Sequence, residues 1–145
     1  MRTAVLSLFA SLLALTCFSS ACADDIPPCT VPNGVTSTSL RTGAPPALVR
    51  ALREHIGELA APGTKFDATD VVVTGRNRRL IFVWYVGKRW IVATEHGGYA
   101  YNDPIFAYDL SQDGRNATLV QERIAFPDTV CSTASSMLGF EPRSP

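Results

Sequence analysis

Hydrophobic and polar residues follow two different periods along this chain, and the change of period separates its predicted elements. Between Pro45 and Pro62 the apolar residues recur every three or four positions, which is the spacing of one helix face. The prolines at 45 and 46 suit a first helical turn, and Pro62-Gly63 is expected to end the helix. The apolar positions of this face are Leu48, Val49, Leu52, Ile56 and Leu59. A helix with one apolar face must pack on another element.

The residues after this helix have the composition and the two-residue period of strands. Residues 80–86 are mostly aromatic or β-branched and are apolar on both alternating faces, which predicts a central strand that buries Trp84. Short turns favour an antiparallel meander of four or five strands, with the amphipathic helix packed on one face. The other predicted strands are 69–74, 90–94, 99–110 with a kink at 102–104, and 117–126.

The remaining segments complete an α+β organisation. Residues 24–44 are rich in Pro, Ser and Thr and are predicted to be an irregular arm. Residues 45–140 are expected to form a single α+β domain, which ends in a short helix capped by Asp128. Residues 141–145 are expected to be a loose tail.

The first 23 residues have the pattern of a secretory signal. Arg2 precedes an apolar run at 4–15, and the stretch ends in Ala21-Cys22-Ala23, a small-residue cleavage site. The run is shorter than the ~20 residues that a membrane span needs. We therefore expect cleavage before Asp24 and export to the periplasm or the exterior, without a transmembrane segment. Lipid attachment at Cys22 is the alternative, although the leucine usually found three residues earlier is missing.

Cysteine use fits an oxidising compartment. Of the four cysteines, Cys17 and Cys22 lie within the predicted signal, which leaves Cys29 and Cys131. We expect this pair to form one disulfide that ties the arm to the C-terminal segment. A redox pair or a zinc site is disfavoured, because the chain has no Cys-x-x-Cys motif and no clustered histidines.

The charge balance argues against nucleic acid as a partner. The chain has 13 basic and 13 acidic residues, so it has no strong overall field to attract polyanions. Its densest basic group, Arg76, Arg78 and Arg79, falls in a predicted turn and is expected to be a solvated hairpin tip. We expect no nucleic-acid binding.

Patterns that would indicate catalysis are missing or incomplete. The chain has neither a Gly-x-Ser-x-Gly elbow nor a His-Glu-x-x-His motif, so no catalytic, cofactor or metal site is predicted. His55 is expected to lie exposed on the predicted helix. The acids Glu95, Asp103 and Asp109 are the group that a minimal secreted hydrolase could use as an acid/base pair.

The segment from Glu95 to Asp103 is the predicted partner-binding surface. Gly97-Gly98 would let a strand break there, and the tyrosines at 99 and 101 would share one face. Tyrosines are frequent anchors of protein interfaces. The predicted partner-binding residues are Glu95, His96, Tyr99, Tyr101 and Asp103, with the three polar side chains as rim groups.

The resulting hypothesis is a small exported domain that binds another protein. An inhibitor or an immunity-type neutraliser of an enzyme acting in the cell envelope is its narrower form. Two alternatives remain open. One is a minimal hydrolase that uses the His96–Asp103 region, and the other is a structural envelope lipoprotein, which requires lipid at Cys22.

Overall fold

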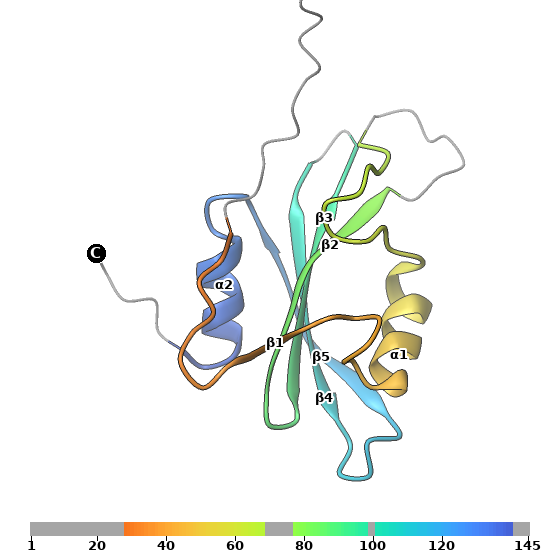
Figure 1. Cartoon of the computed structure of the whole chain (residues 1–145), viewed down its shortest axis with the longest axis vertical. Helices are drawn as coiled ribbons and strands as arrows, with labels where there is room; N and C mark the ends of the chain where they lie inside the picture. The colour runs from red at the N-terminus through yellow and green to blue at the C-terminus, as the bar shows by residue number, and fades with distance from the viewer. Residues whose placement is uncertain (1–27, 69–76, 99–100, 141–145) are drawn as a thin grey trace, which may run out of the picture.

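The computed structural model describes residues 28–68, 77–98 and 101–140, which form one antiparallel sheet and two helices (Figure 1). The strands are β1 (Thr36–Thr38), β2 (Arg78–Val86), β3 (Arg89–His96), β4 (Asp103–Leu110) and β5 (Ala117–Ala125), and the helices are α1 (Pro46–Ile56) and α2 (Val130–Met137). The sheet order is β1-β2-β3-β4-β5, so strands that follow one another along the chain are neighbours. The predicted sheet-rich α+β fold is confirmed.

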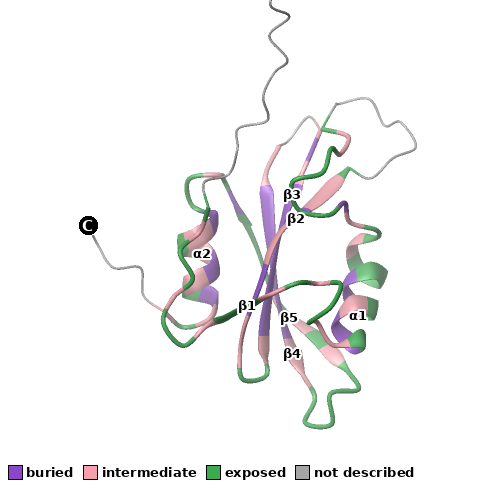
Figure 2. Ribbon diagram, viewed as in Figure 1, coloured by how far each residue is buried: buried purple, intermediate pink, exposed green. Residues whose placement is uncertain are grey.

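The sheet has an apolar core on each face, and the two helices lie on opposite sides of it (Figure 1). On the α1 face, Leu48 and Leu52 of the helix pack in one cluster with Phe106 and Tyr108 of β4. On the α2 face, Val130 and other α2 residues form a second cluster with side chains of β2, β3 and β4. Figure 2 shows the consequence, since β3 and β4 are coloured as buried along most of their lengths.

Both faces of strand β2 pack against a core, which explains why its sequence is apolar at almost every position. Val83 faces the α1 core and Trp84 faces the α2 core, and both side chains are buried. The Trp84 ring also stacks on Phe82, with ring centroids 4.1 Å apart. The prediction that Trp84 lies in the core is confirmed.

Helix α1 ends earlier than its apolar period predicts. Gly57 follows the last helical residue at φ 81°, a conformation that favours glycine, and its N–H donates to Arg53 O. The chain therefore leaves the helix before Leu59, although Leu59 still packs against the α1 core. The expectation that Pro62-Gly63 ends the helix is wrong, because Gly57 ends it first.

The N-terminal arm is more ordered than its composition predicts. Residues 36–38 form β1, which pairs antiparallel with β2, so the description of 24–44 as irregular is wrong at these positions. The predicted disulfide between Cys29 and Cys131 is confirmed, with 5.4 Å between the Cα atoms. It fastens the arm to the first turn of α2.

Helix α2 begins at Val130, and its N-cap residue is Thr129 rather than Asp128. Thr129 occupies the N-cap position, and no side-chain hydrogen bond caps the helix. The Thr129 hydroxyl is instead engaged with the backbone of Phe126, which closes the turn before the helix. The expected cap at Asp128 is therefore wrong.

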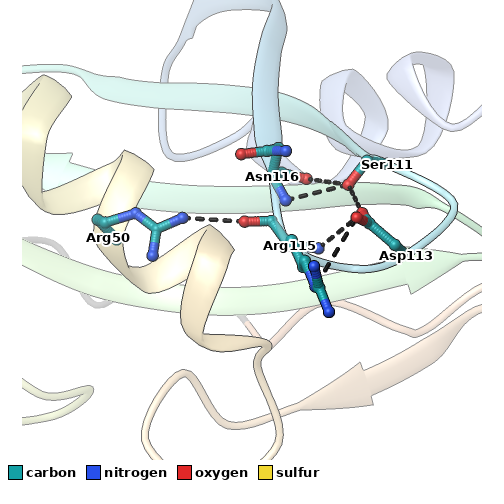
Figure 3. Close-up of polar contacts among 5 residues, drawn as sticks. All are labelled: Arg50, Ser111, Asp113, Arg115 and Asn116. Atoms are coloured by element: carbon teal, nitrogen blue, oxygen red, sulfur yellow. Dashed lines mark hydrogen bonds and ion pairs between the residues drawn. The ribbon is translucent and has the colours of Figure 1, made fainter.

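The β4–β5 loop is held by its own polar side chains (Figure 3). The Ser111 hydroxyl donates to Asp113 and accepts from the Asn116 N–H, while Asp113 accepts from the Arg115 N–H. Arg50 of α1 donates to the Arg115 carbonyl oxygen at 2.9 Å. The loop thus connects the hairpin to the helix packed beside it.

Several expectations lie outside the described residues. They are the signal at 1–23, the strand at 69–74, Arg76, Tyr99 and the tail at 141–145. Within the part of the chain that the structure describes, neither helix is long and apolar enough to span a bilayer.

Candidate functional site

Four polar side chains meet at one end of the sheet, where β2 and β4 begin and β3 ends. This end is uppermost in Figure 1, and we call it the upper end. Arg79 of β2 lies opposite Glu95 of β3, and Asp103 is the first residue of β4. Tyr101 precedes β4 and reaches Glu95. We refer to Arg79, Glu95, Tyr101 and Asp103 as the buried acid cluster.

Glu95 is the centre of this cluster and is fully buried. Arg79 approaches its Oε2 twice, with Nη2 at 2.5 Å and Nε at 2.7 Å. The Tyr101 hydroxyl donates to Oε1. A buried carboxylate costs free energy unless it is paired and hydrogen-bonded, and these contacts compensate both oxygens.

Asp103 is equally buried but has a different environment. Among the described residues, neither carboxyl oxygen has a hydrogen-bond partner. Burial and the neighbouring Glu95 charge raise the pKa of Asp103 from 3.8 to about 7. The two acids therefore differ, since Glu95 is ion-paired with Arg79 while Asp103 holds a proton up to near-neutral pH.

Tyr101 is half-buried, and its hydroxyl is committed to Glu95. Burial, followed by this hydrogen bond and the charges of Glu95 and Asp103, raises the pKa of Tyr101 above its usual value. The ring therefore stays a neutral donor at all ordinary pH values. A side chain held in this way has little freedom to form a new polar contact with a partner.

The segment before residue 69 covers the cluster from outside. The Phe66 ring lies under the Arg79 guanidinium, with 4.8 Å from Cζ to the ring centroid, and the Thr64 carbonyl oxygen accepts from Nη1. Gly97 permits this approach, because a Cβ there would lie 2.4 Å from Ala68 Cα. Gly97 thus allows close packing of a neighbouring segment, to which Gly98 N–H donates at the Ala68 carbonyl oxygen.

His96 lies at the same end on the opposite face of the sheet. It pairs with Arg78, and burial together with the Arg78 charge lowers its pKa. The neutral ring can accept at Nε2, which is 3.2 Å from the amide nitrogen of Asn77. His96 and the buried acid cluster therefore do not share one pocket.

The predicted site residues are brought to one end of the sheet, but not to one surface. Glu95 and Asp103 are interior, so the expectation that they are exposed rim groups is wrong. The reason is that α2 covers the face opposite α1 and the Thr64–Ala68 segment lies over Arg79. Of the predicted partner-binding residues that the structure describes, His96 and Tyr101 are partly exposed. Whether residues 95–103 contact a partner stays a prediction.

The basic residues Arg78 and Arg79 and the acidic residue Asp109 also lie in other surroundings than the sequence predicts. Arg78 and Arg79 lie within β2, and Arg79 is part of the buried cluster, so they are not a solvated turn. Asp109 lies six residues along β4 from Asp103, about 20 Å away in a strand. It accepts two hydrogen bonds from Arg89, which lower its pKa, so it belongs to a separate ion pair.

Exposed apolar side chains gather on β5 and the residue that follows it. Among the described residues, four large hydrophobic side chains are exposed, and three of them are Val120 (46%), Ile124 (64%) and Phe126 (58%). We call these three the β5 surface. The alternation along 117–126 predicted a strand correctly, but it gave no sign that this strand would lie at the edge of the sheet.

Neither a metal site nor a similarity to known proteins assigns a role to the described residues. Within the described part of the chain, no group of three or more His, Cys, Asp or Glu side chains is arranged to hold a metal ion. No model of a known protein family matches the chain, and no curated protein or solved structure is significantly similar to it.

Proposed function

We propose that this protein is an exported domain that binds another protein, and that the β5 surface is its contact region. One observation carries the proposal: three of the four exposed large hydrophobic side chains of the described residues lie on β5 or directly after it. Apolar side chains gathered on one exposed element are a common feature of interaction sites, whereas scattered ones are ordinary.

The β5 surface adjoins the segment that the sequence indicates. Ala125 pairs with Asp103, so Ile124 and Phe126 flank the start of β4. Tyr101 lies just before this strand and is partly exposed. A partner seated on the end of β5 would therefore also be close to the Glu95–Asp103 segment.

Export is part of the same proposal. The residue pattern of 1–23 supports a cleaved signal, and a disulfide between Cys29 and Cys131 suits an oxidising compartment. In such a compartment a small disulfide-linked domain would act as an inhibitor or an immunity-type neutraliser of an envelope enzyme. Lipid at Cys22 would make it a membrane-tethered component instead.

Quantitative capture from envelope extract tests the proposal. Immobilised wild type is compared with the Ile124→Lys/Phe126→Lys double variant, and mass spectrometry measures each captured protein. We expect at least one partner to be lost with the double variant. Ser132→Lys, an exposed position on α2, is the matched control and should retain it. If the same proteins are captured by all three forms, the β5 surface is not the interface.

A second candidate, acid/base hydrolysis, is favoured by one observation. Glu95 is ion-paired with Arg79, while the pKa of Asp103 is raised to about 7. Carboxyl groups with such different environments can serve as base and acid. This candidate requires an opening to both buried side chains. Asp103→Asn should then abolish hydrolysis of a small substrate and leave partner capture unchanged.

A further inference from the structure

We propose that β5 binds an extended segment of another protein by strand addition, and that the segment carries a basic residue opposite Glu122 and an acidic residue opposite Arg123. This inference rests on the proposed function and specifies its binding mode and the chemistry of the partner. It follows from three features of β5, which are its position in the sheet, its alternating charges and its exposed apolar residues.

One of the two edges of β5 pairs with no other strand in the part of the chain that the structure describes. β5 is the last strand in the sheet order, and among the described residues only β4 pairs with it. Every second residue of an edge strand directs its N–H and C=O away from the sheet, where another strand can pair with them. Nine residues make β5 as long as β2, which is ample for such pairing. The backbone chemistry of this edge thus specifies an extended polypeptide as the occupant.

The charges of β5 lie on opposite faces of the sheet. Glu122 pairs with Phe106 of the α1 core, and Arg123 pairs with Ile105 of the α2 core. Directly opposed residues of an antiparallel pair share a face, so an added strand meets a carboxylate on one face and a guanidinium on the other. Adjacent basic and acidic residues in the partner would match both.

Both charged groups are held in place but remain open to a partner. His55 Nε2 of α1 lies 3.5 Å from Glu122, whose side chain is 47% exposed. With the Gln121 amide oriented so that its oxygen faces Arg123, that oxygen accepts from the Arg123 guanidinium at 2.9 and 3.0 Å. These contacts restrict the side chains without removing their charge, which favours selection of a partner by charge.

Apolar residues flank the charged pair and define the rest of the motif. Ile124 follows Arg123, and Val120 lies two residues before Glu122. Val120 falls between the paired positions 119 and 121 and has no partner on β4, which marks a bulge. The motif that fits is a basic and an acidic residue with apolar residues on either side.

A second copy of this chain fits less well than a foreign segment. In a two-fold antiparallel pair of β5 strands, the register that places Val120 opposite Ile124 also places Glu122 opposite its own copy. The register that places Val120 opposite Phe126 does the same with Arg123. Like charges directly opposite one another are destabilising. Both registers that bring exposed apolar residues of the two copies together therefore disfavour self-pairing.

Nuclear magnetic resonance titration with two synthetic peptides tests the inference. The matched peptide has the core Val-Asp-Lys-Thr-Val, which places Lys opposite Glu122 and Asp opposite Arg123 in an antiparallel pair. The exchanged peptide has the core Val-Lys-Asp-Thr-Val. The protein is the ¹⁵N-labelled oxidised chain beginning at Asp24, used as wild type and as the Glu122→Lys/Arg123→Glu variant.

We expect the matched peptide to shift β5 amide signals in the wild type and to bind about tenfold more tightly than the exchanged peptide. In the charge-exchanged variant this preference should reverse. Equal affinities, shifts confined to other elements, or no shifts at millimolar peptide would overturn charge-selected strand addition. Shifts of β5 signals with protein concentration alone would also overturn it, because a second copy would then occupy the edge.

Failure of this inference and failure of the proposed function give different results. If a captured partner is lost with Ile124→Lys/Phe126→Lys but retained by the charge-exchanged variant, protein binding stands and charge-selected strand addition is wrong. If capture is unaffected by the double lysine variant, the β5 surface is not the interface. A peptide preference that reverses with the charges would still support the edge as a strand-binding site.

Discussion

At the residue scale, the two acids at the upper end of the sheet show how environment separates chemically similar side chains. Glu95 has Arg79 and the Tyr101 hydroxyl as partners, while Asp103 has no hydrogen-bond partner among the described residues. Burial of an unpartnered carboxyl favours its protonated form, whereas a guanidinium favours the anion. Burial and the nearby Glu95 thus favour the protonated form of Asp103, while Glu95 is engaged in an ion pair with Arg79.

Asp103 predicts that stability declines as the pH rises from about 4 to about 7. The native pKa is about 7 against 3.8 for the unfolded chain, so the native state binds the proton more tightly. Its stabilising contribution is complete below the unfolded pKa and is lost as the pH rises through the native pKa. We expect Asp103→Asn to flatten this decline, measured by urea unfolding at pH 5 and pH 8. Asp113→Asn, an exposed control, should keep the wild-type decline.

Trp84 gives the second prediction at this scale. The side chain is buried in the α2 core, so Trp84→Ala leaves a cavity and should lower the free energy of unfolding by about 3–5 kcal/mol. Ile124→Ala is the control, because that side chain is 64% exposed. Denaturant unfolding measures both. A Trp84→Ala protein as stable as the control would mean that the face assignment of β2 is wrong.

At the element scale, the sequence predicts what local periodicity encodes and misses what depends on tertiary neighbours. The two-faced apolar run of β2 predicts a central strand, because that property requires only knowledge of the strand itself. Burial of Glu95 depends on Arg79 opposite it and on the segment at Thr64–Ala68, neither of which its own pattern reveals. β1 is likewise set by its pairing with the distant β2, and the edge position of β5 depends on whether any strand besides β4 pairs with it.

Close packing at the end of β3 gives the prediction at this scale. A Cβ on Gly97 would lie 2.4 Å from Ala68 Cα and 2.6 Å from the Asp67 carbonyl oxygen, so Gly97→Ala must push the covering segment away. We expect a loss of about 1–3 kcal/mol in the free energy of unfolding, as overpacking usually costs. Thr118→Ala on exposed β5 should change it by less than about 0.5 kcal/mol. Chemical denaturation of both variants decides, and equal stabilities would contradict close packing.

At the scale of the whole molecule, the disulfide joins the two ends of the described chain. Cys29 and Cys131 are 102 positions apart, so the bond connects the arm with α2 across the intervening helix and strands. Cross-linking such a long loop restricts the unfolded chain and stabilises the native state by about 4–5 kcal/mol in the chain-entropy model. A β5 edge held in a defined position by this framework would lose little conformational entropy on binding.

The last prediction concerns the form in which this framework exists after export. We expect the mature protein to begin at Asp24 and to contain no free thiol, because Cys17 and Cys22 leave with the signal while Cys29 and Cys131 are bonded. Intact mass and thiol titration of the protein recovered from the cell envelope measure both properties. Reduction followed by alkylation should then expose two thiols and lower the unfolding midpoint. A mass increased by lipid at Cys22 would instead show a tethered protein, and two thiols before reduction would contradict the disulfide.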